Sequence, residues 1–274
     1  MKVALFGQFF YPDSGKYIKQ LVSVLQERGD EIWFEKKYCK LIDEEKILEI
    51  RQPKVFEKLD DTFDFFFCIG GDGTILSAIR FVKDLNIPTV GINTGRLGFL
   101  ASIHKDEIKE TLNSILSGKH AISERSIIQI ETHPDNVIEG DFKYALNEIA
   151  ISRKDSTSMI TIETWLNQDY LNAYWADGLI ISSPTGSTGY SLSCGGPIVT
   201  PETKAMIITP IAPHNLNARP LVFPDDKKLK FKIHAREDFF LISMDSRTYT
   251  LPTNTEIKIQ KASFSIPLVQ LHES

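Results

Sequence analysis

The sequence predicts an α/β domain with a parallel sheet, followed by an all-β sandwich, and the pattern changes near residue 123. Before this point, short apolar segments alternate with segments whose apolar residues recur every three or four positions, as in alternating strands and helices. After it, short strand-like runs follow one another without long helical periodicity, which is typical of an antiparallel sandwich or barrel. We therefore assign residues 1–123 to the α/β domain and residues 124–263 to the sandwich. The apolar residues 266–271 could join either domain.

The first domain begins with an apolar strand over residues 3–7 and a helix after it. Asp13 or Ser14 can cap the start of this helix, and Gly29 can end it in the left-handed conformation. Apolar residues recur on one face of the helix, at Ile18, Leu21, Val22 and Leu25.

Two more pairs of a strand and a helix follow. Residues 63–69 are nearly all apolar, as expected for a central parallel strand covered on both faces, and residues 87–92 form the next strand. Each strand precedes a helix with one apolar face, formed by Ile75, Ala78, Ile79 and Val82 in the first helix and by Ile108, Leu112 and Ile115 in the second. The second helix ends near Gly118. This alternation predicts a parallel sheet.

The second domain consists of short strand-like runs. They are expected at residues 126–132, 142–152, 160–166, 171–175, 179–182, 229–235, 239–244 and 256–260. Asn167, Gln168 and Asp169 form a plausible hairpin tip between two of these runs. Because no flexible linker or repeat separates the two parts, we expect two packed domains.

The composition is that of a globular protein and excludes several classes. The 274 residues are 42% hydrophobic and carry a net charge of −5, so neither a disordered chain nor a nucleic-acid-binding protein is expected. The longest apolar runs are too short to span a membrane. The N-terminus has no small-residue cleavage site, and Cys39, Cys68 and Cys194 lack metal-type spacing. We therefore expect a reduced, cytoplasmic protein without a secretion signal.

The segment Gly70-Gly71-Asp72-Gly73-Thr74 lies between the most apolar predicted strand and the following helix. This junction is at the carboxyl end of a parallel strand, where open α/β sheets bind ligands. Glycines let backbone N–H groups approach a phosphate, and a helix N-terminus favours negative charge. A carboxylate there would repel phosphate unless it accepts a proton from an attacking hydroxyl or holds a metal. The alternative is a tight turn in which Asp72 caps the helix.

Two further polar segments interrupt or follow apolar runs. Residues 93–100, with the sequence NTGRLGFL, should line the same sheet edge, where Arg96 could meet a phosphate or simply be solvated. Asn147 and Glu148 lie inside an apolar run, where polar groups are costly to bury unless hydrogen-bonded. An amide can pair with a base edge and a carboxylate can accept two ribose hydroxyls, so the pair suits a nucleoside. A bulge or a polar pair on an edge strand is the alternative.

The longest polar segment covers residues 183–197, SPTGSTGYSLSCGGP, shortly after Asp177 and Gly178. Its glycines, prolines and hydroxyl side chains make it conformationally unusual. Such a loop is more often functional than a plain surface connection.

The four motifs, in this order and at these spacings, resemble those of the NAD kinase family. With Pro213-His214 and Arg219-Pro220 further on, the resemblance covers residues 63–220. GGDGT alone is shared with lipid kinases and phosphofructokinases, whereas SPTGSTGYSLS together with the Asn-Glu pair is far more specific. The resemblance implies an α/β domain and a β-sandwich with NAD between them, and residues 264–274 completing the first domain. It also implies a homodimer or homotetramer.

The resemblance further implies roles for individual residues. Asp72 would accept the proton of the adenosine-ribose 2′-hydroxyl, and Gly73 would contact the substrate through its backbone. Asn147 and Glu148 would hold the adenosine portion, and Asp177 would lie near the nicotinamide end. The dinucleotide would be lined by one short segment, consisting of Thr188, Gly189, Tyr190, Ser191, Leu192 and Ser193.

Three residues depart from the family pattern. Gly189 stands where Ala is usual, which adds space beside the substrate. Cys194 stands where a small Ala is common, so we expect a small buried residue, with a redox switch as the alternative. Arg247 follows Asp245 and Ser246 at a position where Gln is frequent, and it could meet a phosphate or face solvent.

Two aromatic residues near the implied nicotinamide end have open roles. Trp175 lies at a variable family position two residues before Asp177, and it either shapes the nicotinamide pocket and disfavours NADH or lies in the core. His214 is either a site residue or a hydrogen-bonded structural histidine.

The implied activity is the transfer of phosphate from ATP or polyphosphate to NAD, giving NADP, with a divalent metal such as Mg²⁺. No G-x-G-x-x-G follows the first strand, which argues against a dehydrogenase, and no P-loop motif is present. A lipid kinase would need an apolar acceptor pocket, against which the hydroxyl-rich residues 185–193 argue. A non-catalytic dinucleotide sensor would not need Asp72. Formation of NADP from NAD, ATP and Mg²⁺ separates these three alternatives.

Overall fold

The computed structural model describes residues 1–8, 14–48, 52–95, 98–101, 103–135, 137–140, 142–155, 158–215 and 217–271. The chain forms two compact units. Unit 1 comprises Met1–Glu124 with Ile266–Ser274, and unit 2 comprises Arg125–Ser265. None of the helices in the described ranges combines the length and the apolar composition that a transmembrane helix requires.

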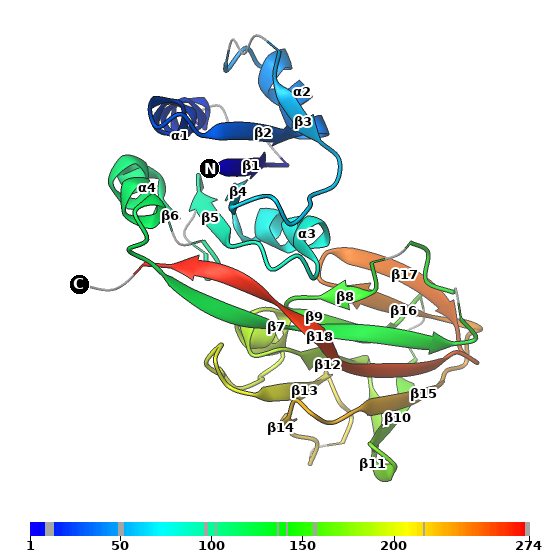
Figure 1. Ribbon diagram of the computed structural model, residues 1–274. Coiled ribbons are helices and arrows are strands. Elements are labelled where there is room, and N and C mark those ends of the chain that lie inside the picture. Colours follow the sequence, from blue (N-terminus) through cyan, green and yellow to red (C-terminus); the bar gives the residue numbers. More distant parts are fainter. Residues whose placement is uncertain are drawn as a thin grey trace. The chain divides into compact units, whose positions relative to one another are not determined.

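Unit 1 is built on a parallel sheet (Figure 1). Its strands are β1 (Lys2–Phe6), β2 (Glu31–Glu35), β3 (Lys54–Phe56), β4 (Phe65–Ile69), β5 (Thr89–Asn93) and β6 (Ile103–His104). Their order is β5-β4-β1-β2-β3. On the free side of β5, β6 and residue Leu268 of the last strand, β18 (Glu256–Gln270), also pair in parallel. The predicted parallel α/β class is therefore confirmed for this unit.

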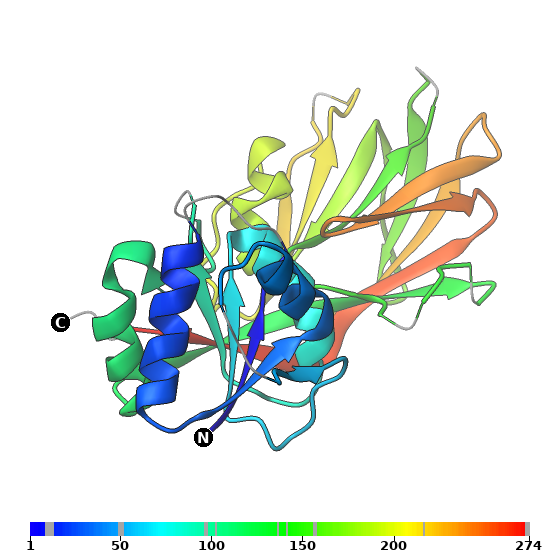
Figure 2. The ribbon, with the colours of Figure 1, turned by 90° about the horizontal axis from the view of Figure 1, so that it is seen from above.

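Helices cover both faces of this sheet. They are α1 (Gly15–Glu27), α2 (Lys36–Glu44), α3 (Asp72–Val82) and α4 (Ile108–Leu116), with a 3₁₀ turn, η1 (Lys105–Glu107), before α4. Figure 2 shows α1 and α4 side by side on one face. On the other face, Phe81 of α3 packs against Phe6 and Phe66, with ring centroids 5.2 and 6.2 Å apart. All the apolar residues that were expected to form the inner faces of α1, α3 and α4 are buried.

The ends of α1 agree in part with the sequence pattern. Gly29 follows the helix with a φ of +78°, as expected for a glycine that terminates a helix. Ser14 is the N-cap residue but makes no capping hydrogen bond with its side chain, and Asp13 lies outside the described residues.

Strand β4 is the centre of unit 1, between β1 and β5, and all five of its residues are buried. Its neighbour β5 is buried along its whole length as well. The carboxyl ends of both strands lie next to each other, because Ile69 pairs with Ile92. The segments that follow the two strands, which begin at Gly70 and at Thr94, therefore leave the sheet at the same edge, as the sequence pattern predicts.

The elements β2, α2 and β3 were not expected from the sequence. Only the last two residues of β2 are buried, and charged residues bound it, so no continuous apolar run marks it. Helix α2 follows β2 directly, with the Glu35 carboxylate accepting the backbone N–H groups of Lys37 and Tyr38 at 2.9 Å. Glutamate is not among the usual capping residues, so the start of α2 carries no ordinary sequence signal.

Unit 2 is a β-sandwich. Its strands are β7 (Ala121–His133), β8 (Tyr144–Ala145), β9 (Glu148–Arg153), β10 (Ile160–Leu166), β11 (Asp169–Ala176), β12 (Gly178–Ser182), β13 (Ala205–Ile211), β14 (Leu221–Pro224), β15 (Leu229–His234), β16 (Phe239–Met244) and β17 (Arg247–Pro252), together with the first part of β18. One sheet is antiparallel with the order β14-β13-β12-β9-β16-β17, and the other contains β11-β10-β15-β18. Apolar side chains of both sheets form one core, so the predicted sandwich is confirmed.

The structure of unit 2 confirms one predicted hairpin and contradicts one predicted strand. Strands β10 and β11 form the predicted hairpin, in which Asn167 has a φ of +57° and Leu166 pairs with Asp169. The single strand predicted for residues 142–152 is wrong. The chain leaves the short strand β8, which pairs with β7, and enters β9 in the six-stranded sheet. Residues 146 and 147 lie at this crossing. The sequence pattern also did not reveal β13, β14 and β17.

Candidate active site

The glycine turn after β4 requires glycine at its first position. Gly70 has a φ of +153°, and a Cβ atom on it would lie 2.2 Å from the hydroxyl of Thr74. Its N–H group donates to the carbonyl of Ile92 at 2.9 Å, which ties the turn to β5. A Cβ atom on Gly71 or Gly73 would meet nothing within 4 Å, so the backbone of the turn borders open space on that side.

Asp72 is the first residue of α3, and its carboxylate contacts the second motif. One carboxylate oxygen accepts the N–H of Phe99 at 2.8 Å, and the other accepts the N–H of Leu100 at 3.2 Å. A Cβ atom on Gly98 would lie 2.2 Å from the carboxylate, so a side chain at this position would displace it. The alternative in which Asp72 caps the helix is wrong, because Gly71 is the N-cap residue. The structure thus joins the first two motifs through Asp72.

In the second motif, Asn93 is buried and Phe99 is exposed. Asn93 is fully buried, and its side-chain oxygen accepts the N–H of Gly95 at 2.7 Å. Phe99 is 73% exposed beside the Asp72 carboxylate, although the sequence reading gave it no role. Arg96 lies outside the described residues.

Asn147 ends the crossing between β8 and β9 in unit 2, and Glu148 is the first residue of β9. Among the described residues, the side-chain oxygen Oδ1 of Asn147 and Oε2 of Glu148 are buried and have no hydrogen-bond partner. Burial raises the pKa of Glu148 to about 7, and the nearby negative charge of Asp245 adds to this shift, whereas the backbone N–H of Tyr190 opposes it. The pair therefore presents two buried oxygen acceptors whose bonding capacity is not used within the described part of the chain.

The loop after β12 packs directly onto this pair. The N–H of Ser183 donates to the carbonyl of Asn147 at 2.9 Å, and the Ser183 hydroxyl donates to the carbonyl of Leu146. A Cβ atom on Gly186 would lie 2.0 Å from the Asn147 carbonyl, so only glycine allows this contact. A Cβ atom on Gly189 would lie 2.9 Å from Oε2 of Glu148. The third and fourth motifs therefore form one structural group.

The predicted lining residues in this loop differ in accessibility. They fall in a 3₁₀ turn, η2 (Thr185–Thr188), and a short helix, α5 (Tyr190–Ser193). The exposed side chains are those of Tyr190, Leu192 and Ser193, whereas Thr188 and Gly189 are half-buried. Ser191 is fully buried, and its hydroxyl is 2.7 Å from that of Thr209. The side chain of Ser191 is thus engaged in the interior of unit 2.

Trp175 lies near the end of β11, and Asp177 lies between β11 and β12. Asp177 forms an ion pair with Arg153, with 2.9 Å between the carboxylate and Nε. Trp175 is 48% exposed, so the alternative that it lies in the core is wrong. Its ring packs on that of His214 with centroids 4.3 Å apart, and the backbone N–H of His214 donates to the Trp175 carbonyl.

Two other residues with open roles are now placed. Cys194 is half-buried, and burial raises the pKa of its thiol, which disfavours the thiolate that a redox switch needs. Arg247 donates to the carbonyls of Phe142, at 2.6 Å, and Tyr144. It therefore neither simply faces solvent nor offers an unengaged guanidinium to a phosphate. Sequence reasoning missed the Asp245 carboxylate, which accepts hydrogen bonds from the backbone N–H groups of Asn147 and Glu148.

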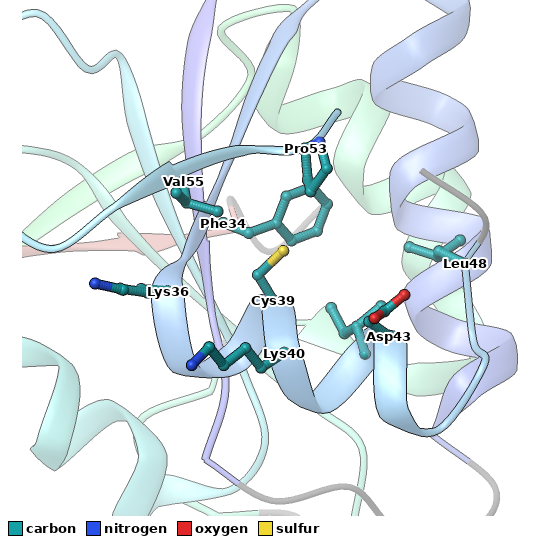
Figure 3. Close-up of a pocket in the computed structure, with 9 residues that line it drawn as sticks. Phe34, Lys36, Cys39, Lys40, Asp43, Leu48, Pro53 and Val55 are labelled. Atoms are coloured by element: carbon teal, nitrogen blue, oxygen red, sulfur yellow. The ribbon is translucent and has the colours of Figure 1, made fainter. Parts of the chain in front are cut away.

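A separate cavity of about 360 Å³ lies in unit 1 between α2 and the strands β2 and β3 (Figure 3). Its lining is mostly apolar, and the ring of Phe34 and the thiol of Cys39 face each other there. None of its lining residues belongs to the four motifs, so it is not part of the candidate site. Within the described ranges, no three His, Cys, Asp or Glu side chains are grouped as in a protein-built metal site.

Comparison with known proteins agrees with this arrangement. Residues 9–120 match the ATP-NAD kinase N-terminal domain, and residues 146–271 match the ATP-NAD kinase C-terminal domain. The NAD kinase of Christiangramia forsetii is 52% identical over 273 residues, which cover 99% of this chain and 93% of that protein. The NAD kinase of Flavobacterium johnsoniae is 44% identical over 274 residues, with coverage of 99% and 93%.

Two solved structures share the fold. Yeast NADH kinase complexed with NADH has a TM-score of 0.85 at 22% identity, covering 100% of this chain and 84% of that one. An NAD kinase from Archaeoglobus fulgidus in complex with ATP has a TM-score of 0.74 at 24% identity, covering 99% and 93%. The matches to both domains and the curated relatives argue against the lipid-kinase and sensor alternatives. The chain therefore belongs to the NAD kinase family and is an enzyme of that activity.

Proposed function

We propose that this NAD kinase transfers a phosphoryl group from ATP to the adenosine-ribose 2′-hydroxyl of NAD, with Asp72 as the acceptor of the hydroxyl proton. The observation that carries this proposal is the Asp72 carboxylate, which two backbone N–H groups hold at the carboxyl end of β4. A ribose hydroxyl is a poor nucleophile while it keeps its proton, and a positioned base contributes about 10²–10⁴-fold to such a step.

The geometry of Asp72 suits a fixed base. Each carboxylate oxygen has two lone pairs, and the bonds to Phe99 and Leu100 use one on each oxygen. One further hydrogen bond can be accepted on either oxygen without disturbing these contacts. Because the side chain is already oriented, little rotational freedom is lost when the hydroxyl arrives.

Unit 2 supplies the pair that we propose to hold the adenosine. A buried oxygen acceptor without a partner costs about 1–3 kcal/mol, so the two such oxygens of Asn147 and Glu148 favour a ligand that donates to them. Ribose hydroxyls can donate to the Glu148 carboxylate, and the amino group of adenine can donate to Asn147.

The remaining site residues of unit 2 are proposed from their place in the loop that packs on this pair, and Gly73 of unit 1 from its place in the glycine turn. Tyr190, Leu192 and Ser193 offer exposed side chains to the dinucleotide, and Thr188 and Gly189 are half-buried beside them. Gly73 offers its backbone from the turn after β4. Ser191 would contribute through its backbone, since its hydroxyl is engaged with Thr209. Asp177 would act near the nicotinamide end.

The phosphate donor is proposed to be ATP, with polyphosphate as the alternative, together with a divalent metal such as Mg²⁺. Mg²⁺ is usually bound through one or two carboxylates and the phosphates of the substrate, so it needs no protein cage of several acids. Asp72, the single acid in the glycine turn, fits such a site as a one-carboxylate ligand. When bound, the metal neutralises charge on the transferring phosphate.

We also propose a cytoplasmic location and a homodimer or homotetramer.

Steady-state kinetics test the adenosine assignment. Glu148→Gln should raise the KM for NAD about 10- to 150-fold, because a hydrogen bond to a charged partner contributes about 1.5–3 kcal/mol. Glu139→Gln is the matched control, since Glu139 is exposed in the same unit. An unchanged kcat/KM for NAD in the Glu148 variant would refute the assignment. A panel of ATP and polyphosphate in the same assay identifies the donor.

A further inference from the structure

We propose that Asp245, in the turn between β16 and β17, and Arg247, the first residue of β17, are positioning residues for NAD: they fix the backbone that carries Asn147 and Glu148. This inference rests on the proposed role of that pair in holding adenosine. The sequence pattern assigned Asp245 no role, and for Arg247 it left open a contact with a phosphate or a position facing solvent.

The need for such a support comes from the course of the chain. At residues 146 and 147 the chain has left β8 and has not yet entered β9, so it has no strand partner. Leu146 is fully buried. Buried backbone N–H groups must be paired, since an orphaned one costs about as much as a lost hydrogen bond.

Asp245 provides this pairing with its side chain. Its carboxylate accepts the N–H groups of three consecutive residues, Leu146 at 3.0 Å, Asn147 at 2.8 Å and Glu148 at 3.3 Å. Its own N–H donates to the carbonyl of Glu148 at 3.0 Å. Asp245 has a φ of +50°, a conformation that Asp and Asn tolerate better than most residues. The turn therefore binds the crossing segment as a neighbouring strand would.

Arg247 holds the part of the chain just before this segment, at residues 142 and 144. Its two terminal nitrogens donate to the carbonyls of Phe142 and Tyr144, and the guanidinium lies 4.8 Å from the centre of the Phe142 ring. The planar guanidinium has several donors in a fixed fork, so one side chain serves both acceptors. The amide of a glutamine carries a single NH₂ group on a shorter side chain and is less suited to spanning both carbonyls.

These contacts matter for the ligand because, together with those of Ser183 and Tyr190, they hold the backbone and the carboxyl group that carry the two acceptor oxygens. Oδ1 of Asn147 and Oε2 of Glu148 have no partner among the described residues, so their positions follow from the backbone beneath them. A loosened turn would let this backbone move. The expected result is weaker binding of NAD, with no direct contact between Arg247 and the substrate.

The charge of Asp245 gives a second link to Glu148. The groups that act on the Glu148 carboxyl are Asp245 from the β16–β17 turn and Tyr190 from α5, and the Asp245 charge raises the pKa of Glu148. A neutral residue at position 245 should therefore shift the pH dependence of NAD binding toward lower pH. A purely structural contact would not have this effect.

The main test uses Arg247→Ala, with Arg236→Ala as the matched control, because Arg236 is exposed in the same unit. Arg247→Ala should raise the KM for NAD about tenfold or more, with the KM for ATP within about twofold and a smaller change in kcat. Arg247→Lys keeps the charge and loses the fork, and it should give an intermediate KM for NAD even if the Ala variant does not fold. A wild-type KM for NAD in a folded Arg247 variant overturns the proposal.

A double-mutant cycle separates this proposal from the proposed function. If the turn acts through Glu148, Arg247→Ala should raise the KM for NAD less in the Glu148→Gln background than in the wild type. Full additivity of the two effects overturns the positioning role. If Glu148→Gln alone leaves the KM for NAD unchanged, the adenosine assignment fails instead. Asp245→Asn should in addition lower the pH at which NAD binding becomes strong, and an unshifted pH profile counts against the charge link.

Discussion

The substitution Asp72→Asn separates the chemistry of the proposed base from its structural contacts. Asparagine keeps the size of aspartate but cannot accept the proton, so kcat should fall about 10²-fold or more. The structure adds a second cost, because both carboxylate oxygens accept N–H groups. The amide nitrogen of asparagine would face one of these donors, which loses its acceptor. That loss costs about 1 kcal/mol at this partly exposed position, or roughly 2–4 °C in Tm.

The assay is steady-state formation of NADP together with thermal unfolding of the same samples. The affinity for NAD should stay within roughly tenfold of the wild type, since the adenosine is held by other residues. Asp84→Asn, an exposed acid just after α3, is the control and should leave kcat and Tm unchanged. Near-normal turnover by the folded Asp72→Asn variant would refute the reasoning. If raised Mg²⁺ restores most of the rate, Asp72 chiefly holds the metal.

Two further predictions follow from the same contacts. Gly98→Ala would place a Cβ atom 2.2 Å from the Asp72 carboxylate, so kcat should fall about tenfold or more while KM for NAD changes less. An unchanged kcat would show that the loop does not orient Asp72. In the folded chain Glu148 keeps its proton up to a pKa of about 7, above the ordinary value of 4.5. The free energy of unfolding should therefore fall as the pH rises between these two values, by about 3 kcal/mol at most. Melting curves at pH 5 and pH 8 should show a smaller decline for Glu148→Gln, and an equal decline in both proteins contradicts the shift.

The fold class and the buried faces of three helices could be predicted from local sequence patterns. The helical faces of α1, α3 and α4 could be predicted because a buried stripe requires apolar residues at helical spacing, which is a local property. Strand β4 could be predicted because a strand buried on both faces is apolar throughout. The glycine turn could be placed at the sheet edge because it directly follows that strand. The elements β2, α2 and β3 could not, because a partly exposed strand at the side of a sheet carries no such pattern.

The residues that support the site are brought together by contacts between distant parts of the chain. Asp72 meets the N–H groups of Phe99 and Leu100, and Asp245 meets those of residues 146–148, which are about a hundred positions away in the chain. No spacing rule predicts such pairs, since they depend on the path of the whole chain between them.

The break of the predicted strand at residues 142–152 has the same origin. The apolar pattern continues to the fully buried Leu146 and resumes at the fully buried Ile149, so it does not reveal the interruption between them. The backbone hydrogen bonds, however, go to the side chain of Asp245 rather than to a strand. Hydrophobic periodicity reports which side chains are buried, whereas the partner of a backbone N–H group is set by what the fold brings next to it.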